Sequence, residues 1–368
     1  MKSRQVVFRA DASLEMGAGH IMRCLTLANA LRAQGYECHF VCREHPGNLI
    51  EFIRTQGHCV HSLAYVPGNS NGYVEGEGAV LAHAAWLGAS QLQDAAACQP
   101  ILADIKPQWL VTDHYALDSR WEQALASHYD RLMVIDDLAD RSHHCDLLLD
   151  QTFGRDAADY EPRVPPTCKI LCGAHYALLR PEFAELRSYS LERRQSPSLK
   201  RILVSMGGVD RDNATGLILD VLDRQPLPDD CEIVVVSGPS APWLNTVREQ
   251  AAQLSHPTTV QAGVSDMARL MAESDLAIGA AGATSWERCC LGLPTIMVVL
   301  AENQRIVAQG LEAATAAKVI SSPELIDDVL PALLRPILDS KTILVAMSQA
   351  AAQVTDGQGT QAVIRYLE

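Results

Sequence analysis

Residues 7–34 read VFRADASLEMGAGHIMRCLTLANALRAQ, a short apolar strand that leads through a glycine-rich turn into a helix. The turn contains Gly17 and Gly19, and glycine lets the backbone approach a ligand closely. The helix that follows offers unpaired N–H groups and the positive end of its dipole, which suit a phosphate. This order of elements predicts one βα unit of a parallel α/β sheet, with an anion site at the turn.

His20 is the titratable residue at this turn, at the start of the predicted helix. An imidazole there stands where a bound phosphoester would be attacked, and the helix dipole disfavours its protonated form. We therefore interpret His20 as a general base that is neutral near pH 7. The alternative is a histidine that only caps the helix or packs locally, because a single Gly-x-Gly turn is a weak signal.

The bulk composition limits the class of protein. The 368 residues are enough for two domains, each with a core of its own. A net charge of −14 argues against a nucleic-acid-binding protein but is compatible with a nucleotide ligand. The 11 cysteines include no C-x-x-C pair, which favours free thiols in a reducing cytoplasm. No apolar run reaches the about 18 residues of a membrane span, and the N-terminal residues show no secretion signal.

One short cluster, at residues 143–146, has the composition of a metal site because it reads HHCD. Adjacent residues of an extended segment point to opposite faces, and no second pair of ligands follows at a useful spacing. We therefore expect no metal site there.

Apolar strand patterns alternate with helical patterns along the chain, as in parallel α/β proteins. A polar stretch at 195–198 separates two such series, and residues 67–72 have the composition of a loop. The expected strands are 5–10, 38–42, 58–63, 109–113, 131–135, 146–149 and 169–172 in the first series, and 201–205, 232–237, 258–261, 276–279 and 295–300 in the second. The expected helices include 20–34, 47–56, 79–104, 118–128 and 212–223, with a last helical stretch near 341–367.

The two series predict two doubly wound parallel-sheet domains that face each other across a ligand cleft. We expect the N-terminal domain, with His20, at 1–190 and a nucleotide-binding domain at 198–345. The helical segment 346–368 is expected to cross back to the N-terminal domain.

Three clusters follow strands of the second series, where open α/β sheets bind their ligands. Glycines at 205–208 would let backbone N–H groups reach a diphosphate, and a carboxylate within 279–288 would accept both hydroxyls of a ribose. Neutral amides at 301–304 suit the hydroxyl or acetamido groups of a sugar. Ordinary turns and helix caps are the alternative interpretation. The candidate residues are Ser205, Gly207, Gly208, Thr284, Ser285, Glu287, Asn303 and Gln304.

These clusters, in this order, resemble the C-terminal half of GT-B nucleotide-sugar enzymes, and their pattern is most similar to the UDP-N-acetylglucosamine transferase that makes lipid II. Three motifs of the first half narrow the resemblance. They read Arg9-Ala-Asp-x5-Gly-x-Gly-His-x-x-Arg-x-Leu, Thr112-Asp-His-Tyr-x-Leu-Asp and Ile135-Asp-Asp-Leu-Ala-Asp-Arg-x-His-x-Cys-Asp-Leu-Leu-Leu-Asp-Gln. Together they resemble the UDP-2,4-diacetamido-2,4,6-trideoxy-β-L-altropyranose hydrolase family of pseudaminic acid biosynthesis.

The resemblance implies a GT-B fold and a role for each candidate residue. His20 would activate water, while Tyr115 and Asn303 would line the sugar pocket. Thr284, Ser285 and Glu287 would hold the UDP part, with the turn 205–208 near the phosphates. Asp11, before the glycine turn, would orient His20 or hydrogen-bond the sugar.

The implied reaction is hydrolysis at the anomeric carbon with inversion, in which His20 takes a proton from the attacking water. Helix starts and backbone N–H groups would hold the charge of the leaving UDP without a metal or other cofactor. The expected partner is a small UDP-sugar, with no nucleic acid and no membrane, and the sequence sets no oligomeric state. The alternatives are a GT-B glycosyltransferase that passes a UDP-activated amino sugar to an acceptor, and a UDP-sugar binding protein without catalysis.

Overall fold

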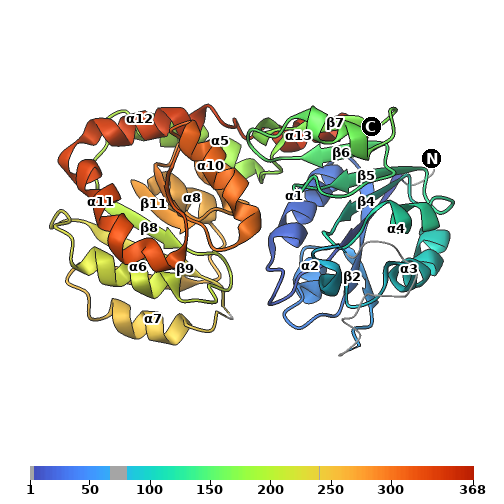
Figure 1. The fold of residues 1–368 in the computed structure, drawn as a ribbon, viewed down its shortest axis with the longest axis horizontal. Coiled ribbons are helices and arrows are strands. Elements are labelled where there is room, and N and C mark those ends of the chain that lie inside the picture. Colours follow the sequence, from blue (N-terminus) through green and yellow to red (C-terminus); the bar gives the residue numbers. More distant parts are fainter. Residues whose placement is uncertain (1–3, 67–80, 240) are drawn as a thin grey trace. The chain divides into compact units, whose positions relative to one another are not determined.

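The protein, described here from a computed structural model, divides into two compact units (Figure 1). Unit 1 comprises Met1–Leu178 and Thr360–Glu368, and unit 2 comprises Leu179–Gly359. The structure describes residues 4–66, 81–239 and 241–368. The loop predicted at 67–72 therefore lies outside the described residues.

Unit 1 is built on a seven-stranded parallel sheet with the order β3-β2-β1-β4-β5-β6-β7. The chain winds outward from β1 in one direction and then from β4 in the other, so the strand order reverses between these two neighbours. All seven strands expected in the first series are confirmed. They are β1 (Arg4–Ala10), β2 (Tyr36–Arg43), β3 (Cys59–Leu63), β4 (Trp109–Asp113), β5 (Arg131–Ile135), β6 (Leu147–Asp150) and β7 (Lys169–Cys172).

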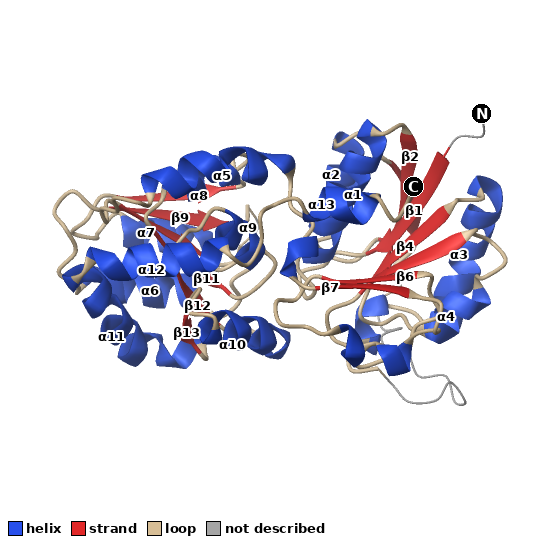
Figure 2. Ribbon diagram, turned by 90° about the horizontal axis from the view of Figure 1, so that it is seen from above, coloured by secondary structure: helices blue, strands red, loops and turns tan. Residues whose placement is uncertain are grey.

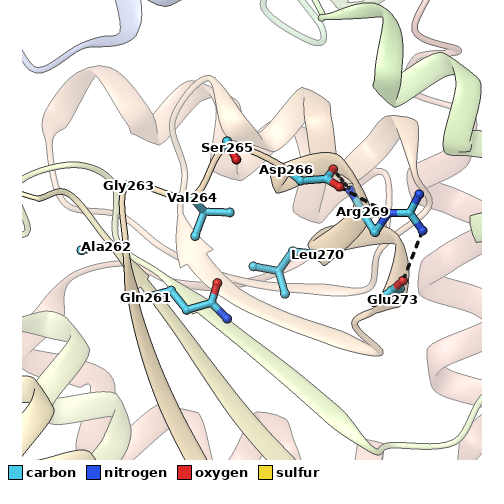
Figure 3. A pocket seen from close by; sticks show the side chains of 9 residues that line it. All are labelled: Gln261, Ala262, Gly263, Val264, Ser265, Asp266, Arg269, Leu270 and Glu273. Atoms are coloured by element: carbon cyan, nitrogen blue, oxygen red, sulfur yellow. Dashed lines mark hydrogen bonds and ion pairs between the residues drawn. The ribbon is translucent and has the colours of Figure 1, made fainter.

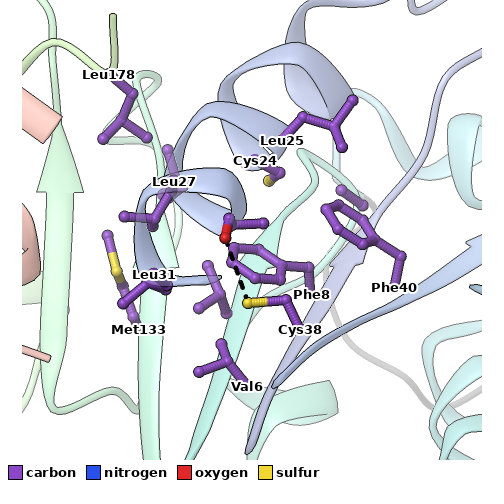
Figure 4. Close-up of a cluster of buried hydrophobic side chains, with 14 of the residues drawn as sticks. Val6, Phe8, Cys24, Leu25, Leu27, Leu31, Cys38, Phe40, Met133 and Leu178 are labelled. Atoms are coloured by element: carbon purple, nitrogen blue, oxygen red, sulfur yellow. Dashed lines mark hydrogen bonds between the residues drawn. The ribbon is translucent and has the colours of Figure 1, made fainter. Parts of the chain in front are cut away.

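Helices cover both faces of this sheet, which explains why its strands are continuous apolar runs (Figure 2). On one face α1 (Gly19–Ala33), α2 (Ile50–Thr55) and α13 (Gly359–Ile364) enclose a core that includes Phe8 and Phe40, whose rings stack (Figure 4). On the other face α3 (Gln91–Ile105) and α4 (Ser119–Ala124) cover a second core around Trp121.

The single helix expected at 79–104 is interrupted in the structure. A short 3₁₀ turn, η1 (Ala84–Leu87), ends at Gly88, which has a φ of +68°. A new helix, α3, then begins after Ser90, whose hydroxyl accepts the Gln93 N–H while the Gln93 side chain accepts the Ser90 N–H. This reciprocal cap starts a separate helix at a point where the apolar pattern alone is continuous.

Unit 2 is a six-stranded parallel sheet with the order β10-β9-β8-β11-β12-β13, which reverses between β8 and β11. Five of these strands are the expected ones, and the sixth, β13, has three residues, too few to show a pattern. The strands are β8 (Arg201–Ser205), β9 (Glu232–Ser237), β10 (Thr258–Ala262), β11 (Leu276–Ala280), β12 (Thr295–Val298) and β13 (Lys318–Ile320). The helices are α5 (Pro181–Arg193), α6 (Ala214–Asp223), α7 (Leu244–Ala251), α8 (Met267–Glu273), α9 (Thr284–Cys290), α10 (Arg305–Ala313), α11 (Ile326–Asp339) and α12 (Lys341–Ala352).

The boundary between the units lies at Leu178–Leu179 rather than in the expected interval between 190 and 198. Helix α5, which was not predicted, holds the preceding segment to unit 2. At its end, the buried guanidinium of Arg194 donates hydrogen bonds to the carbonyls of Met271, Ser274 and Leu291. Hydrogen bonds from a side chain to carbonyls produce no apolar periodicity in the sequence, so the segment has the composition of a linker.

The C-terminal residues return to unit 1. The helical stretch expected at 341–367 breaks after α12, and Gly357 adopts a φ of +85° before α13. Leu367 is fully buried, and its carbonyl accepts hydrogen bonds from the Tyr36 hydroxyl and the Trp109 indole N–H. Within the described ranges, no helix has the length and apolar character that a bilayer crossing needs.

Candidate active site

The reversal of strand order in unit 1 brings His20 and Asp113 together. Ala10, the last residue of β1, pairs with Asp113, the last residue of β4, so both strands end at the same edge. His20 lies in the first turn of α1, the helix that follows β1. Its Nδ1 lies 2.6 Å from Asp113 Oδ1, although the two residues are 93 positions apart. Ligand sites of open α/β sheets form at this kind of reversal.

The Asp113 carboxylate fixes which imidazole nitrogen of His20 can act as a base. A carboxylate only accepts hydrogen bonds, so the contact assigns the ring proton to Nδ1 and leaves Nε2 free to accept one. Arg23, one turn further along α1, donates its Nε and Nη2 to the two oxygens of Asp113 at 2.6 and 2.7 Å. Burial alone would raise the pKa of Asp113, but the charges and hydrogen bonds of Arg23 and His20 outweigh it and lower that pKa.

The structure also places Tyr115 beside His20. The two rings meet edge to face with their centroids 4.7 Å apart. Trp86 stacks on Tyr115 at 5.8 Å, and the Arg141 guanidinium lies 5.9 Å from the centre of the tyrosine ring. Burial, together with the charge of Asp137 and a hydrogen bond to its carboxylate, raises the pKa of the Tyr115 hydroxyl, which therefore stays protonated. An imidazole base with an aromatic wall is a suitable environment for a sugar ring.

The glycine turn has the geometry that its sequence predicts. Gly17 has a φ of +76°, a conformation that favours glycine, and its N–H donates to the Ser13 carbonyl at 2.9 Å. A Cβ placed on Gly19 would meet no atom within 4 Å, so the backbone at the helix start is open. Among the described residues no side chain caps this end of α1.

Asp11 pairs with residues other than His20, so its expected role in orienting His20 is corrected, while its alternative role, a hydrogen bond to the sugar, stays a prediction. Its side chain is fully buried, forms an ion pair with Arg9 at 2.8 Å and accepts the backbone N–H of Arg43 at 2.6 Å. Its second oxygen faces the ring nitrogens of His45 and His114 at 3.6 and 3.4 Å. The pattern Arg9-Ala-Asp led to Asp11, directly after β1, as the predicted partner, whereas the observed partner of His20 is Asp113 at the end of β4. A carboxylate at the end of a neighbouring strand was the signal available for finding it.

In unit 2, the corresponding reversal brings the first two predicted clusters together. Ser205, the last residue of β8, pairs with Gly279 of β11. The turn after β8 includes Gly207, which has a φ of +87°, and Gly208. The Gly208 carbonyl packs so closely on Gly238 that residue 238 has no room for a side chain. The start of the following helix, α6, is already occupied: Asp210 accepts the N–H groups of its first two residues, and Asn213 accepts that of the third. Only the turn itself remains to meet a phosphate.

The second cluster divides into inward-facing and outward-facing side chains. Ser285 is fully buried, and its hydroxyl accepts a hydrogen bond from the Arg288 guanidinium at 3.2 Å, so it supports the turn and does not face a ligand. Thr284 and Glu287 are half-buried. Burial raises the pKa of Glu287 to about 7, although Arg180, 3.9 Å away, and Arg288 lower it. A carboxylate that titrates near neutrality is a frequent sign of a functional site.

The third cluster follows β12, which lies beside β11 in the sheet. Asn303 is exposed in the short turn η5 (Glu302–Gln304), with its amide accessible. Gln304 is half-buried, and its side-chain oxygen accepts the Leu300 N–H at 2.9 Å, which leaves only its amide donors for a ligand.

A further pocket, which the sequence did not reveal, lies at the edge of the same sheet (Figure 3). It forms beyond the carboxyl end of β10, between Gln261 and the start of α8. Val264 and Leu270 give it an apolar lining, and Arg269 is held at its rim by Asp266 and Glu273. None of the residues predicted from the sequence line this pocket.

The histidine-rich segment 143–146 has structural partners. His143 Nδ1 lies 2.6 Å from Glu122, and the sulfur of Cys145 lies 3.6 Å from that of Cys168. In the part of the chain that the structure describes, no group of three or more potential ligands has the arrangement of a metal site. All eleven cysteines, each within the described residues, are free in this structure.

The comparison with protein families matches residues 202–361 to the glycosyltransferase family 28 C-terminal domain. The matched segment spans less than half of the chain and shows a similarity to this domain. It includes β8, α6, β11 and α9, and thus both clusters at the reversal of strand order in unit 2. The match ends at residue 361, so it assigns no family to unit 1.

Two relatives extend the similarity beyond the family 28 domain. The UDP-2,4-diacetamido-2,4,6-trideoxy-β-L-altropyranose hydrolase of Campylobacter jejuni is 26% identical over 307 residues, which are 83% of this chain and 96% of the relative. The spore coat polysaccharide biosynthesis protein SpsG of Bacillus subtilis is 27% identical over 202 residues, or 54% of this chain and 58% of the relative.

Solved structures confirm the fold class. MurG of Acinetobacter baumannii aligns with a TM-score of 0.67 and 18% identity over 99% of both chains. The MnaA–UDP structure from S. aureus aligns with a TM-score of 0.63 and 14% identity, over 99% of this chain and 96% of that one. The predicted α/β fold of GT-B type, with two doubly wound parallel sheets, is thus confirmed.

Proposed function

We propose that this chain hydrolyses a UDP-activated amino sugar at its anomeric carbon. The observation that carries the proposal is the His20–Asp113 pair, with Nδ1 and Oδ1 2.6 Å apart at the strand reversal of unit 1. The similarity to the Campylobacter jejuni hydrolase, which spans 96% of that protein, supports UDP-2,4-diacetamido-2,4,6-trideoxy-β-L-altropyranose as the substrate.

In the proposed mechanism, Nε2 of His20 takes a proton from water as the water oxygen attacks the anomeric carbon. The bond from that carbon to the diphosphate oxygen breaks, and its electron pair leaves with UDP, so that the sugar is released with inverted configuration. Asp113 keeps the Nδ1 proton in place and stabilises the imidazolium that forms. A nucleoside diphosphate is a good leaving group, so the reaction needs no general acid to protonate it, whereas a glycosidase uses one.

The family 28 domain supplies the proposed nucleotide site. Glu287 would accept the ribose hydroxyls, the turn after Ser205 would meet the diphosphate, and Asn303 would bind an acetamido group of the sugar. Thr284 would add a hydroxyl beside the phosphates, and Tyr115 of unit 1 would line the sugar pocket. The reaction requires that His20 reach the anomeric carbon of a sugar whose nucleotide is bound in this way.

The direct test is to incubate the protein with a panel of UDP-di-N-acetyl sugars in oxygen-18 water. We expect UDP release from the L-altro substrate alone, with the label in the free sugar and inversion visible by NMR. Label in UDP would mean attack at phosphorus, and no release from any member of the panel would overturn the proposal.

A glycosyltransferase is the second candidate, because the family 28 domain and the MurG-like fold are shared with transferases. The same incubation separates the two activities. A transferase releases little free sugar without an acceptor, whereas the proposed hydrolase needs only water.

A further inference from the structure

Arg288, on α9, is a buried cation that lacks a counter-ion. Its side chain is 2% exposed, and its Nη2 donates hydrogen bonds to the Ala280 carbonyl and the Ser285 hydroxyl, while its Nε has no partner. Within the described ranges, no carboxylate lies at ion-pair distance from it. Burial lowers the pKa of this guanidinium to about 10, so it still carries its charge at neutral pH. An uncompensated buried charge is costly for a folded protein.

The position of this charge coincides with the strand reversal of unit 2. A Cβ on Gly279 would lie 2.2 Å from Arg288 Nη1 and 3.0 Å from the Ser205 carbonyl oxygen. The guanidinium therefore packs against the end of β11 where β11 meets the end of β8. Both turns assigned to the diphosphate, at 205–208 and 280–285, begin beside it.

The start of α6 offers little positive charge to a ligand at this place. The start of α6 would normally attract an anion, but Asp210 and Asn213 already accept its first N–H groups. Asp210 also adds a negative charge there. A diphosphate bound to the turn after β8 thus depends on another cation for electrostatic stabilisation.

We infer that Arg288 is a positioning residue for the diphosphate: it holds the turn 280–285 through Ala280 and Ser285, and its charge is neutralised only when the nucleotide binds. This inference rests on the proposed function. As the sugar–oxygen bond breaks, negative charge builds up on the diphosphate, and a fixed cation in a low-dielectric environment stabilises that charge. A purely structural arginine would instead support uridine and UDP binding equally.

The test measures binding of uridine, UDP and inorganic pyrophosphate by calorimetry. Arg288→Gln keeps hydrogen-bond donors and removes the charge, Arg288→Lys keeps the charge, and Arg288→Met removes both. We expect Arg288→Gln and Arg288→Met to weaken UDP and pyrophosphate binding by about 10-fold or more, with uridine affinity changed less than about 2-fold. Arg288→Lys should restore most of the UDP affinity.

A stability measurement on the unliganded protein adds an independent readout. Replacing an uncompensated buried charge by an apolar side chain of similar size often stabilises a protein, so Arg288→Met should keep or raise the melting temperature. Arg194→Met is the matched control, because Arg194 is equally buried and also donates to carbonyls. It makes the same exchange of a buried charge for an apolar side chain, and it should leave the ratio of UDP to uridine affinity unchanged.

The outcomes are distinguishable. Equal losses of uridine and UDP affinity in Arg288→Gln, or no loss of either, would overturn the inference while leaving the proposed function intact. Failure of the wild-type protein to bind UDP would instead remove the proposed function, and the inference with it.

Discussion

His20 acts through a hydrogen bond that its own sequence neighbourhood does not provide. Asp113 is fully buried, and it is held by Arg23, which also forms an ion pair with Asp137 at 2.8 Å. The imidazole is therefore kept in one tautomer by a chain of charges that starts on its own helix. This arrangement leads to predictions for the base and for the residue that orients it.

Replacement of His20 tests the base directly. His20→Ala removes the proposed general base, and we expect turnover to fall by about 10² or more. UDP affinity, measured by calorimetry, should stay within about 2-fold of the wild-type value, because His20 is not assigned to the nucleotide. Wild-type turnover in this variant would exclude His20 as the base.

Asp113→Asn tests the orientation of the base. The amide cannot favour the same tautomer, and we expect kcat to fall by roughly 10² to 10⁴ with a smaller change in KM. Stability should fall by about 3 kcal/mol, because Arg23 loses the fully buried one of its two counter-charges and keeps only Asp137. Asp11→Asn is the matched control: a similar loss of kcat per folded molecule would restore Asp11 as a partner of the base.

The proposed contact between Glu287 and the ribose predicts that uridine binding depends on pH. Its pKa is raised from 4.5 to about 7, and only the ionised carboxylate accepts both ribose hydroxyls. Uridine affinity, measured by calorimetry, should therefore fall by up to about 10-fold per unit as the pH drops below 7. Glu287→Gln should bind uridine more weakly and without this dependence. A flat profile for the wild-type protein would exclude Glu287 from the ribose site.

The raised pKa of Glu287 also determines how this residue changes the stability of the protein with pH. Between pH 4.5 and about 7 the folded protein keeps the Glu287 proton that the unfolded chain loses. The contribution of this group to stability is therefore present at low pH and is lost as the pH rises through that window. Urea unfolding at pH 5 and pH 8 gives the free energy of unfolding of the wild-type protein and of Glu287→Gln. If this free energy changes equally with pH in the two proteins, the predicted contribution of Glu287 is contradicted.

At the scale of elements, the strands were the most predictable parts because both sheets are covered on both faces. A doubly covered parallel strand is a short apolar run, and such runs are visible in the sequence. The helices were less predictable. The start of α3 depends on the Ser90 cap, and the charged helix α5 is held by hydrogen bonds from Arg194 to carbonyls, which no apolar period indicates.

Gly279, near the end of β11, and Gly282, in the turn that follows it, provide an element-scale test. Gly279→Ala would place a methyl group 2.2 Å from Arg288 Nη1, and we expect unfolding free energy to fall by about 1 to 3 kcal/mol. Gly282→Ala is the control, because its Cβ would meet no atom within 4 Å and should change stability by less than about 0.5 kcal/mol. Equal effects in urea unfolding would contradict the close contact.

At the scale of the whole molecule, the chain leaves unit 1 at Leu178 and returns to it at Thr360. The last nine residues thus complete a core whose other members are encoded more than 150 residues earlier. Leu367 shows this most clearly, because its side chain packs under α1 and its carbonyl receives bonds from β2 and β4.

Leu367→Ala should therefore destabilise unit 1 and not unit 2. Removing a fully buried leucine side chain costs about 2 to 5 kcal/mol. Hydrogen exchange can follow the two units separately, with faster exchange expected in the strands of unit 1 and unchanged exchange in those of unit 2. Arg365→Ala, at an exposed position on the same segment, is the control and should leave both units unchanged.

The sequence by itself determined every strand of the two sheets except the short β13, the glycine turns after β1 and β8, and the position of His20 at a helix start, because apolar runs and glycine conformations are local properties. Only the tertiary structure decided that Asp113 rather than Asp11 meets His20, that Ser285 faces inward, and that Arg288 lies beneath the turn. These outcomes depend on which strand lies beside which. Strand order follows from the burial of side chains far apart in the chain, and a local pattern carries no record of it.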